Sequence, residues 1–305
     1  MTMKYINLAL YFCFISIAFL AKDYGYVGDL IGSFRYQWLL FSFIPATLIA
    51  YHNKKLALCL LTASLFLTGL HLNWQSYFLS EPEKKTQLTV KQINLSYFNP
   101  YIKKELAKLA KEDWDLLVVQ EFNDQHKPLF ESIKPHYFKF GPSQRVGFPM
   151  GIGVITRYPI ISSKVVFTHK ERVGYVELDL LIAREVIKLF AIHPPSPRTR
   201  RDWQLRNALL KRLHNETKDA AGRWVISGDF NTVPWSVYFP FKNSLSCSQV
   251  RVNYHTWHYD SALLFSLIEL PIDNCIVSEA IAITDLQIEQ FNGSDHKLLS
   301  YQITF

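Results

Sequence analysis

Three strongly apolar runs fill the first 80 residues and constrain the fold more than any other feature of the sequence. They extend over about residues 5–21, 37–51 and 56–73, with short polar breaks between them. Each run approaches the ~20 residues that a helix needs to cross the hydrocarbon core of a bilayer. Three runs in succession exclude a single cleaved signal peptide. The sequence therefore predicts a transmembrane region of three helices over residues 1–80.

Charged residues at the ends of these runs predict an orientation. Lys4 precedes the first run, and Lys54 and Lys55 occupy the short break before the third. The positive-inside rule places both positions in the cytoplasm, so three crossings put the rest of the chain on the other side of a cell inner membrane. The second run contains Pro45 and is the weakest; if it does not cross, the rest of the chain returns to the cytoplasm.

The remainder of the chain, residues 86–305, is predicted to be one α/β domain. Short β-branched and apolar runs alternate there with polar and helical segments, and no internal repeat is visible. Its net charge is small, so the basic pI does not by itself indicate a nucleic-acid-binding protein. Cys247 and Cys275 would form a disulfide only in an oxidising compartment, and their spacing leaves the question open.

The segment "WVISGDFNTVPWS", residues 224–236, runs from a predicted strand into polar residues. Gly228 ends the apolar part, and Asp229 and Asn231 follow two residues apart. They would share one face if the strand continued. Asp and Asn are also common turn residues, because their side chains bond to nearby backbone groups. Both interpretations remain open from this segment alone.

Polar residues recur at the ends of other predicted strands. They are Asn94 in "INLSYFN", Glu121 in "VVQEF", His193 in "AIHPPSP", Asp273 in "PIDN", and Asp295 and His296 in "GSDHK". Each one alone is explained by a turn, a helix cap or a buried histidine. Together they supply oxygen ligands and two histidines, as a hard divalent cation and a phosphate ester require. Such donors favour Mg²⁺, with Mn²⁺ as the alternative, over zinc.

These motifs, in this order over some 220 residues, resemble the endonuclease/exonuclease/phosphatase superfamily of DNase I-like and AP-endonuclease-like metal phosphodiesterases. The resemblance implies a membrane-anchored, bacterial-type member. It also implies a four-layer α/β sandwich, with two mixed β-sheets packed face to face and helices outside. The expected activity is hydrolysis of a phosphodiester by metal-activated water.

The resemblance also implies a role for each motif residue. Asn94, Glu121 and Asp295 would hold the metal. Asp229 would activate the attacking water, and Asn231 would bind the scissile phosphate. His296, oriented by Asp273, would contact the phosphate, and His193 would assist the leaving oxygen. Two departures from the family pattern affect the details: Asn274 stands where a histidine often follows the acid, and Pro194 follows His193.

The substrate is the least constrained part of the hypothesis. A basic cluster is formed by Arg198, Arg200, Arg201 and Arg206, with Lys211 and Arg212. A nuclease would use such a cluster for phosphate contacts, with Arg198, Arg200 and Arg201 as the first candidates. A solvated helix face would show the same pattern. A nuclease is the first expectation. A phospholipid or sphingolipid phosphodiesterase or a phosphoinositide phosphatase is the alternative, because the anchor brings lipid headgroups within reach. The aromatic segment "PWSVYFPF", residues 234–241, is either a lipid-inserting loop or part of the core. A catalytically inactive membrane scaffold is the third possibility.

Overall fold

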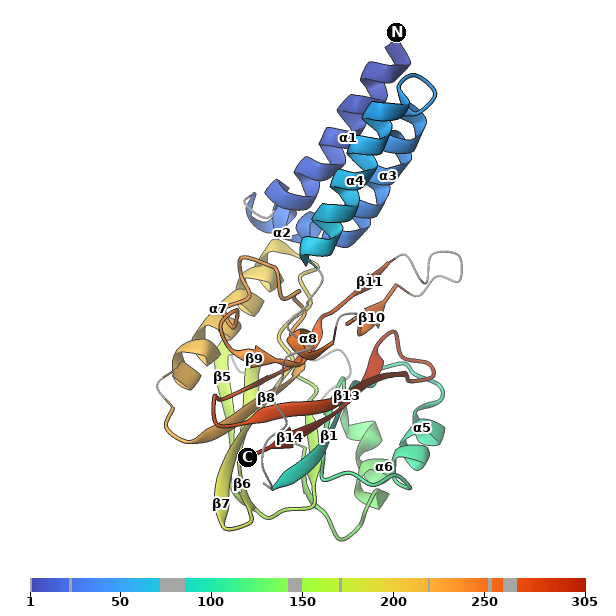
Figure 1. Ribbon diagram of the computed structural model, residues 1–305. Coiled ribbons are helices and arrows are strands. Elements are labelled where there is room, and N and C mark those ends of the chain that lie inside the picture. The colour runs from blue at the N-terminus through green and yellow to red at the C-terminus, as the bar shows by residue number, and fades with distance from the viewer. Residues whose placement is uncertain are drawn as a thin grey trace.

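The structure is a computed structural model that describes residues 2–21, 24–71, 86–141, 150–169, 172–218, 220–251, 254–259 and 268–305. Three long helices project from one end of an α/β domain, and the N-terminus lies at the far end of these helices (Figure 1). The predicted linker at residues 81–85 lies outside the described residues, as does the end of the third apolar run.

The three apolar runs form helices that pack on one another. They are α1 (Thr2–Leu20), α3 (Arg35–Ile49) and α4 (Lys54–His71). Tyr11, Ala46, Ile49 and Leu60 are buried between them. Among the described residues, Met3–Leu20 is the one stretch long and apolar enough to cross a membrane. The 15-residue α3 contains Pro45 and is shorter than a typical span. Crossing by all three helices therefore stays a prediction.

A short helix that the sequence did not reveal fills the first polar break. This helix, α2 (Gly25–Ser33), joins α1 to α3 and lies at the end of the helical bundle that faces the α/β domain (Figure 1). Its buried residues are Gly28, Asp29 and Gly32. Because glycine and aspartate are weak helix formers, the local sequence predicted a polar loop. Contacts with the α/β domain stabilise the helix instead.

Two six-stranded mixed sheets form the centre of the α/β domain. In spatial order, the first contains β13 (Ala282–Gln290), β14 (Lys297–Thr304), β1 (Gln87–Asn94), β2 (Leu116–Gln120), β4 (Gly153–Thr156) and β3 (Phe138–Phe140). The second contains β5 (Ile160–His169), β6 (Val173–Ile182), β7 (Glu185–Ile192), β8 (Arg223–Asp229), β12 (Asp273–Val277) and β9 (Leu245–Ser246). A separate pair, β10 (Trp257–His258) and β11 (Glu269–Leu270), lies nearer the N-terminal helices.

Helices cover the outer faces of both sheets, which gives the predicted four layers. The apolar faces of the two sheets pack on each other, with Val90, Val118, Leu178 and Val225 among the buried residues. The helices α5 (Ile102–Leu109) and α6 (Lys127–Ser132) cover the first sheet, and α7 (Arg200–Lys218) covers the second. A 3₁₀ turn (Asp124–His126) precedes α6, and α8 (Cys247–Val250) follows β9. The predicted fold class is confirmed.

Cys247 and Cys275 form a disulfide, which resolves the alternative left open by the sequence. The bond closes a loop across a sequence separation of 28 and ties α8 to β12. By the chain-entropy estimate such a loop contributes about 3–4 kcal/mol to stability. Disulfides persist in oxidising compartments, so this bond agrees with a domain outside the cytoplasm.

Candidate active site

Four central strands bring their polar ends to one edge of the two sheets. Asn94 ends β1 and Glu121 directly follows β2, and these two strands run parallel. Asp229 ends β8, opposite Asp273 at the start of the antiparallel β12. Residues far apart in sequence therefore meet because β1 and β2 are central in one sheet and β8 and β12 are neighbours in the other.

The strand that ends in Gly228-Asp229 turns sharply after the acid. Gly228 has φ +152°, and an added Cβ there would lie 2.1 Å from the carbonyl oxygen of Ile192. Asn231 adopts φ +50°, and its backbone N–H donates to Asp229 Oδ1 at 2.8 Å. Its side-chain Nδ2 donates to Pro194 O at 3.0 Å. Both interpretations of this segment therefore hold, since the residues form a turn and also lie in the site.

His296 and Asp273 form a buried hydrogen-bonded pair. The Nδ1 atom of His296 lies 2.8 Å from Asp273 Oδ2, and Gln92 Nε2 donates to the other carboxylate oxygen at 2.9 Å. Burial alone would lower the pKa of His296, but Asp273 and then Asp229 outweigh it and raise this pKa to about 10. His296 is therefore a cation at neutral pH, with its Nε2 3.8 Å from Asp229 Oδ2.

His193 occupies a different electrostatic environment. Its Nδ1 lies 3.2 Å from the carbonyl oxygen of Met150, which accepts a hydrogen bond and so requires the proton on Nδ1. Its Nε2 lies 3.8 Å from Asp229 Oδ2. Burial lowers the pKa of His193, and the nearby cationic His296 adds to this. The group that orients His193 is thus a backbone carbonyl, not an acid.

Asn94 and Glu121 lie beside Asp229. The Asn94 amide nitrogen lies 3.3 Å from Glu121 Oε1 and 3.2 Å from Asp229 Oδ2. Tyr97 N–H donates to Glu121 Oε2 at 2.7 Å. Glu121 has φ +54°, and non-glycine residues in this region cluster at functional sites because the surrounding structure must hold them there. The half-buried Asp295 accepts a 2.9 Å hydrogen bond from the Trp257 indole.

The donor set fits a hard divalent cation. Glu121, Asp229 and Asp295 present carboxylates to one pocket, and the Asn94 amide lies between the first two. Burial, and next the neighbouring Asp273, raise the pKa of Asp229 to about 8. One buried carboxylate, Asp229, and the half-buried carboxylates of Glu121 and Asp295 at the same pocket call for a positive counter-charge. Their oxygens suit Mg²⁺ or Mn²⁺, so the residues present match the expected metal.

A second acidic group is less suitable for a metal. Ligand atoms of Asp229, Asp273 and His296 lie within 4.8 Å of one another. However, Asp273 already accepts hydrogen bonds from His296 and Gln92 on its two oxygens. The charge of Asp273 is also balanced by the His296 imidazolium. This group is better described as an acid–base arrangement beside the metal position.

A pocket of about 270 Å³ opens over these residues. Six of the predicted catalytic and metal-binding residues line it: Glu121, His193, Asp229, Asn231, Asp295 and His296. Asn94 and Asp273 bond to these residues from beneath. Of the three predicted substrate-binding arginines, Arg198 lines the pocket. Arg200 and Arg201 are exposed in the first turn of α7 and are not among the lining residues.

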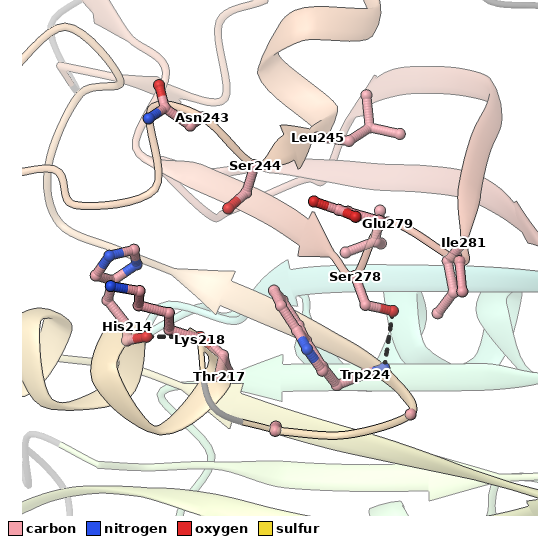
Figure 2. Close-up of a pocket in the computed structure, with 14 residues that line it drawn as sticks. His214, Thr217, Lys218, Trp224, Asn243, Ser244, Leu245, Ser278, Glu279 and Ile281 are labelled. Atoms are coloured by element: carbon pink, nitrogen blue, oxygen red, sulfur yellow. Dashed lines mark hydrogen bonds between the residues drawn. The ribbon is translucent and has the colours of Figure 1, made fainter.

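A larger cavity lies at the other end of β8 and lacks comparable chemistry. Its volume is about 750 Å³, and its lining includes His214 and Lys218 of α7, Trp224 at the start of β8, and Glu279 (Figure 2). Trp224 N–H donates to Ser278 Oγ at 3.2 Å on its wall. Among the described residues it contains one carboxylate and no cluster of acids. Chemistry rather than volume therefore identifies the smaller pocket as the candidate site.

Several site residues were not predicted from the sequence. Gln92 lies two positions before Asn94 in β1, so the strand period offered a signal for it. Trp257 and the α2 residues offered none, because they reach the site from segments distant in sequence. The basic Arg206, part of the same cluster as Arg198 in the sequence, is buried and paired with Asp29. It is therefore not a phosphate contact on an open surface.

Comparisons with known proteins agree with this architecture. Similar solved structures include TDP2 from D. rerio complexed with single-strand DNA product (TM-score 0.60, 14% identity, covering 72% of this chain and 100% of that chain). They also include the 3′ phosphatase NExo from Neisseria bound to a product DNA hairpin (TM-score 0.56, 15%, 72% and 100%). Beta toxin from Staphylococcus aureus is another (TM-score 0.50, 14%, 70% and 99%). At these identities the likeness establishes the fold. No curated protein sequence matches the chain.

The sequence model of one family matches residues 92–296, well over half of the chain. This stretch begins at Gln92 and ends at His296, so it contains each of the strand-end residues that the fold brings together. The protein therefore belongs to the Endonuclease/Exonuclease/phosphatase family, whose members hydrolyse phosphoester bonds with the help of divalent metal ions.

Proposed function

We propose that the protein is a membrane-anchored, Mg²⁺-dependent phosphodiesterase in which water attacks the phosphorus atom. The observation that carries this proposal is the junction of Asn94, Glu121 and Asp229 from the two sheets with the Asp273–His296 pair. In-line displacement at phosphorus needs an activated water, neutralisation of the phosphoryl oxygens and a protonated or stabilised leaving group. The pocket offers a residue for each task.

Glu121, Asn94 and Asp295 would hold the metal ion, which would stabilise negative charge on the phosphoryl oxygens. Asp229 would orient the attacking water and accept its proton. Burial and then Asp273 raise its pKa to about 8, so a neighbouring positive charge would be required to keep this carboxylate ionised for that role. The turn at Asn231 holds this carboxylate in place through the 2.8 Å backbone hydrogen bond.

The two histidines and Asn231 would act on the phosphate and the leaving oxygen. The cationic His296, fixed by Asp273, would neutralise a phosphoryl oxygen, and the Asn231 amide would donate to another. His193 would protonate the leaving oxygen from Nε2 in its doubly protonated form, because its Nδ1 already donates to Met150 O. The lowered pKa of His193 makes that imidazolium the stronger acid, whereas the raised pKa of His296 preserves its positive charge.

Nucleic acid is the first substrate candidate. The similar TDP2 and NExo structures are both complexes with product DNA, and Arg198 at the pocket would contact a phosphate. Phospholipid or sphingolipid phosphodiesters are the second candidate. The observation that favours them is the presence of Leu30, Ser33 and Phe34, which directly precede α3, in the lining of the pocket.

A substrate panel with the purified full chain in detergent tests the proposed function. We expect Mg²⁺- or Mn²⁺-dependent hydrolysis of bis(p-nitrophenyl) phosphate and of at least one of single-stranded DNA, RNA, sphingomyelin and phosphoinositide. Chelation by EDTA should remove the activity, and added Mg²⁺ should restore it. Failure to hydrolyse any diester with either metal would overturn the proposal.

We also propose that the catalytic domain faces away from the cytoplasm in an inner membrane. The N-terminus and the α3–α4 connection lie together at the far end of the helices, whereas α2 and the catalytic domain lie at the near end (Figure 1). Three crossings fit this arrangement. They place the N-terminus and the α3–α4 connection on one side of the membrane, and α2 and the catalytic domain on the other. The Cys247–Cys275 disulfide also supports an oxidising compartment.

Reporter fusions check this orientation. We expect alkaline phosphatase fused after Phe305 to be active, because that enzyme functions outside the cytoplasm, and the same reporter fused after Lys55 to be inactive. A fluorescent protein should give the opposite pattern. Bright fluorescence from the Phe305 fusion would contradict three crossings and favour an intracellular substrate.

A further inference from the structure

The α2 segment contacts the catalytic domain through a buried ion pair. Asp29 is 3% exposed and Arg206 of α7 is 2% exposed. Arg206 Nη2 donates to Asp29 Oδ2 at 2.6 Å, and the Trp203 indole donates to the same oxygen at 3.0 Å. Ser236 Oγ donates to Oδ1. Both oxygens of this carboxylate are thus bonded by the catalytic domain.

The same arginine reaches the catalytic turn. Arg206 Nη1 donates to the backbone carbonyl oxygen of Asn231 at 2.8 Å. Asn231 has the left-handed φ of +50°, a conformation that a non-glycine residue keeps only when its surroundings hold it. The guanidinium therefore joins the carboxylate of Asp29 to the backbone of the residue assigned to the phosphate.

The rest of the segment encloses the pocket. Leu30, Ser33 and Phe34 line it together with the catalytic residues. Phe34 packs against the apolar cluster of Val233, Leu270 and Ile272. Trp235 in the predicted aromatic segment donates to Gly32 O at 3.0 Å and lies edge-on to Tyr36. The aromatic segment, residues 234–241, therefore contacts the N-terminal helices through Trp235. Its Phe239 and Phe241 belong to the core of the α/β domain.

We infer that the segment from Gly25 to Phe34 is part of the active site, and that Asp29 is a positioning residue that fixes Asn231 through Arg206. This inference deepens the proposed function and rests on it. Asp29 neutralises the buried guanidinium, and Asn207 Oδ1 accepts from its Nε and Nη2 at 2.9 and 2.7 Å, which leaves Nη1 directed at the Asn231 carbonyl. Without the carboxylate, Arg206 keeps Asn207 but loses its counter-charge, and the turn that carries Asn231 loses a charged support.

A double-mutant cycle in the full chain tests the inference, with bis(p-nitrophenyl) phosphate as the probe. We expect Asp29→Asn to lower kcat about tenfold with little change in KM, because the loss concerns charge developed in the transition state. In an Asn231→Ala background the same substitution should change kcat less than about twofold, since residues that act as a unit are not additive. Asp113→Asn breaks an exposed ion pair with Arg157 far from the pocket and is the matched control.

A milder variant keeps the test informative if Asp29→Asn folds poorly. Ser236→Ala removes the donor to Asp29 Oδ1 and retains the ion pair, so a loss of about threefold in kcat is expected, again absent in the Asn231→Ala background. Equal losses with and without Asn231 would overturn the inference, as would full activity of a folded Asp29→Asn protein. Absence of wild-type hydrolysis would instead count against the proposed function, so the two failures are distinguishable.

Discussion

Replacement of Glu121 by alanine is expected to abolish hydrolysis while the protein stays folded. The carboxylate is the main anionic ligand of the proposed metal site, and a lost metal removes several kcal/mol of transition-state stabilisation, or at least about a thousandfold in kcat/KM. The structural cost is small, because Glu121 accepts a backbone hydrogen bond from Tyr97 and a 3.3 Å one from the Asn94 amide, each worth about 1 kcal/mol. Initial rates with Mg²⁺ and a thermal unfolding curve measure the two effects separately.

Two companion variants define how the Glu121 result is interpreted. Glu121→Gln keeps the size of the side chain and removes its charge, so it should lose activity without the cavity that alanine leaves beside Tyr97 and Asn94. Glu131→Ala removes an exposed acid from α6 and should retain wild-type rates. A fully active Glu121→Ala protein, or wild-type activity that survives EDTA, would contradict the metal mechanism.

The Asp273–His296 pair is expected to behave as a single catalytic unit. Asp273→Asn and His296→Ala should each lower kcat by at least about a hundredfold, within the range usual for a positioned proton or charge donor. The double variant should lose little more, because each single change already disables the pair. Multiplicative losses in the double variant would show that the two residues act independently.

The pH dependence of Asp273→Asn provides a second measurement. In the wild type the carboxylates overcome the effect of burial and hold the pKa of His296 near 10, so the imidazolium persists through neutral pH and is lost only as pH rises through that value. Without the Asp273 charge this pKa falls, and any residual activity should decline at lower pH than in the wild type. An unchanged alkaline limit would contradict the assigned role of Asp273.

The strand ends were predictable because their signals are local. Apolar runs that end at Asn94, Glu121 and Asp229 or contain Asp273 can be read residue by residue, and the fold then brings these residues to one edge. The ordered motifs added the expectation of two stacked sheets, which the structure confirms. The family match from residue 92 to 296 covers the same strand ends.

The contacts of Asp29 were not predictable because each partner is distant in sequence. Asp29 lies 177 positions from Arg206 and 207 from Ser236, and no periodicity connects a short polar break to a catalytic turn. Arg206 belongs to the basic cluster that was expected to contact phosphate. Its side chain is instead buried and paired with Asp29. The hydrogen-bond partner of His193 was also not predictable. It is a backbone carbonyl, which every residue type carries, so the sequence does not mark its position.

The ion pair between Asp29 and Arg206 also fixes the distance between the active-site pocket and the start of α3. A catalytic domain joined to a membrane only by a flexible tether would sample every height that the tether allows. Here a second attachment through α2 holds the pocket within about one helical turn of the start of α3. If α3 crosses the bilayer as proposed, the pocket stays at one fixed height above the hydrocarbon core. The enzyme then reaches phosphates at that height only. A scissile bond deeper in the bilayer or farther into the solvent lies out of its range.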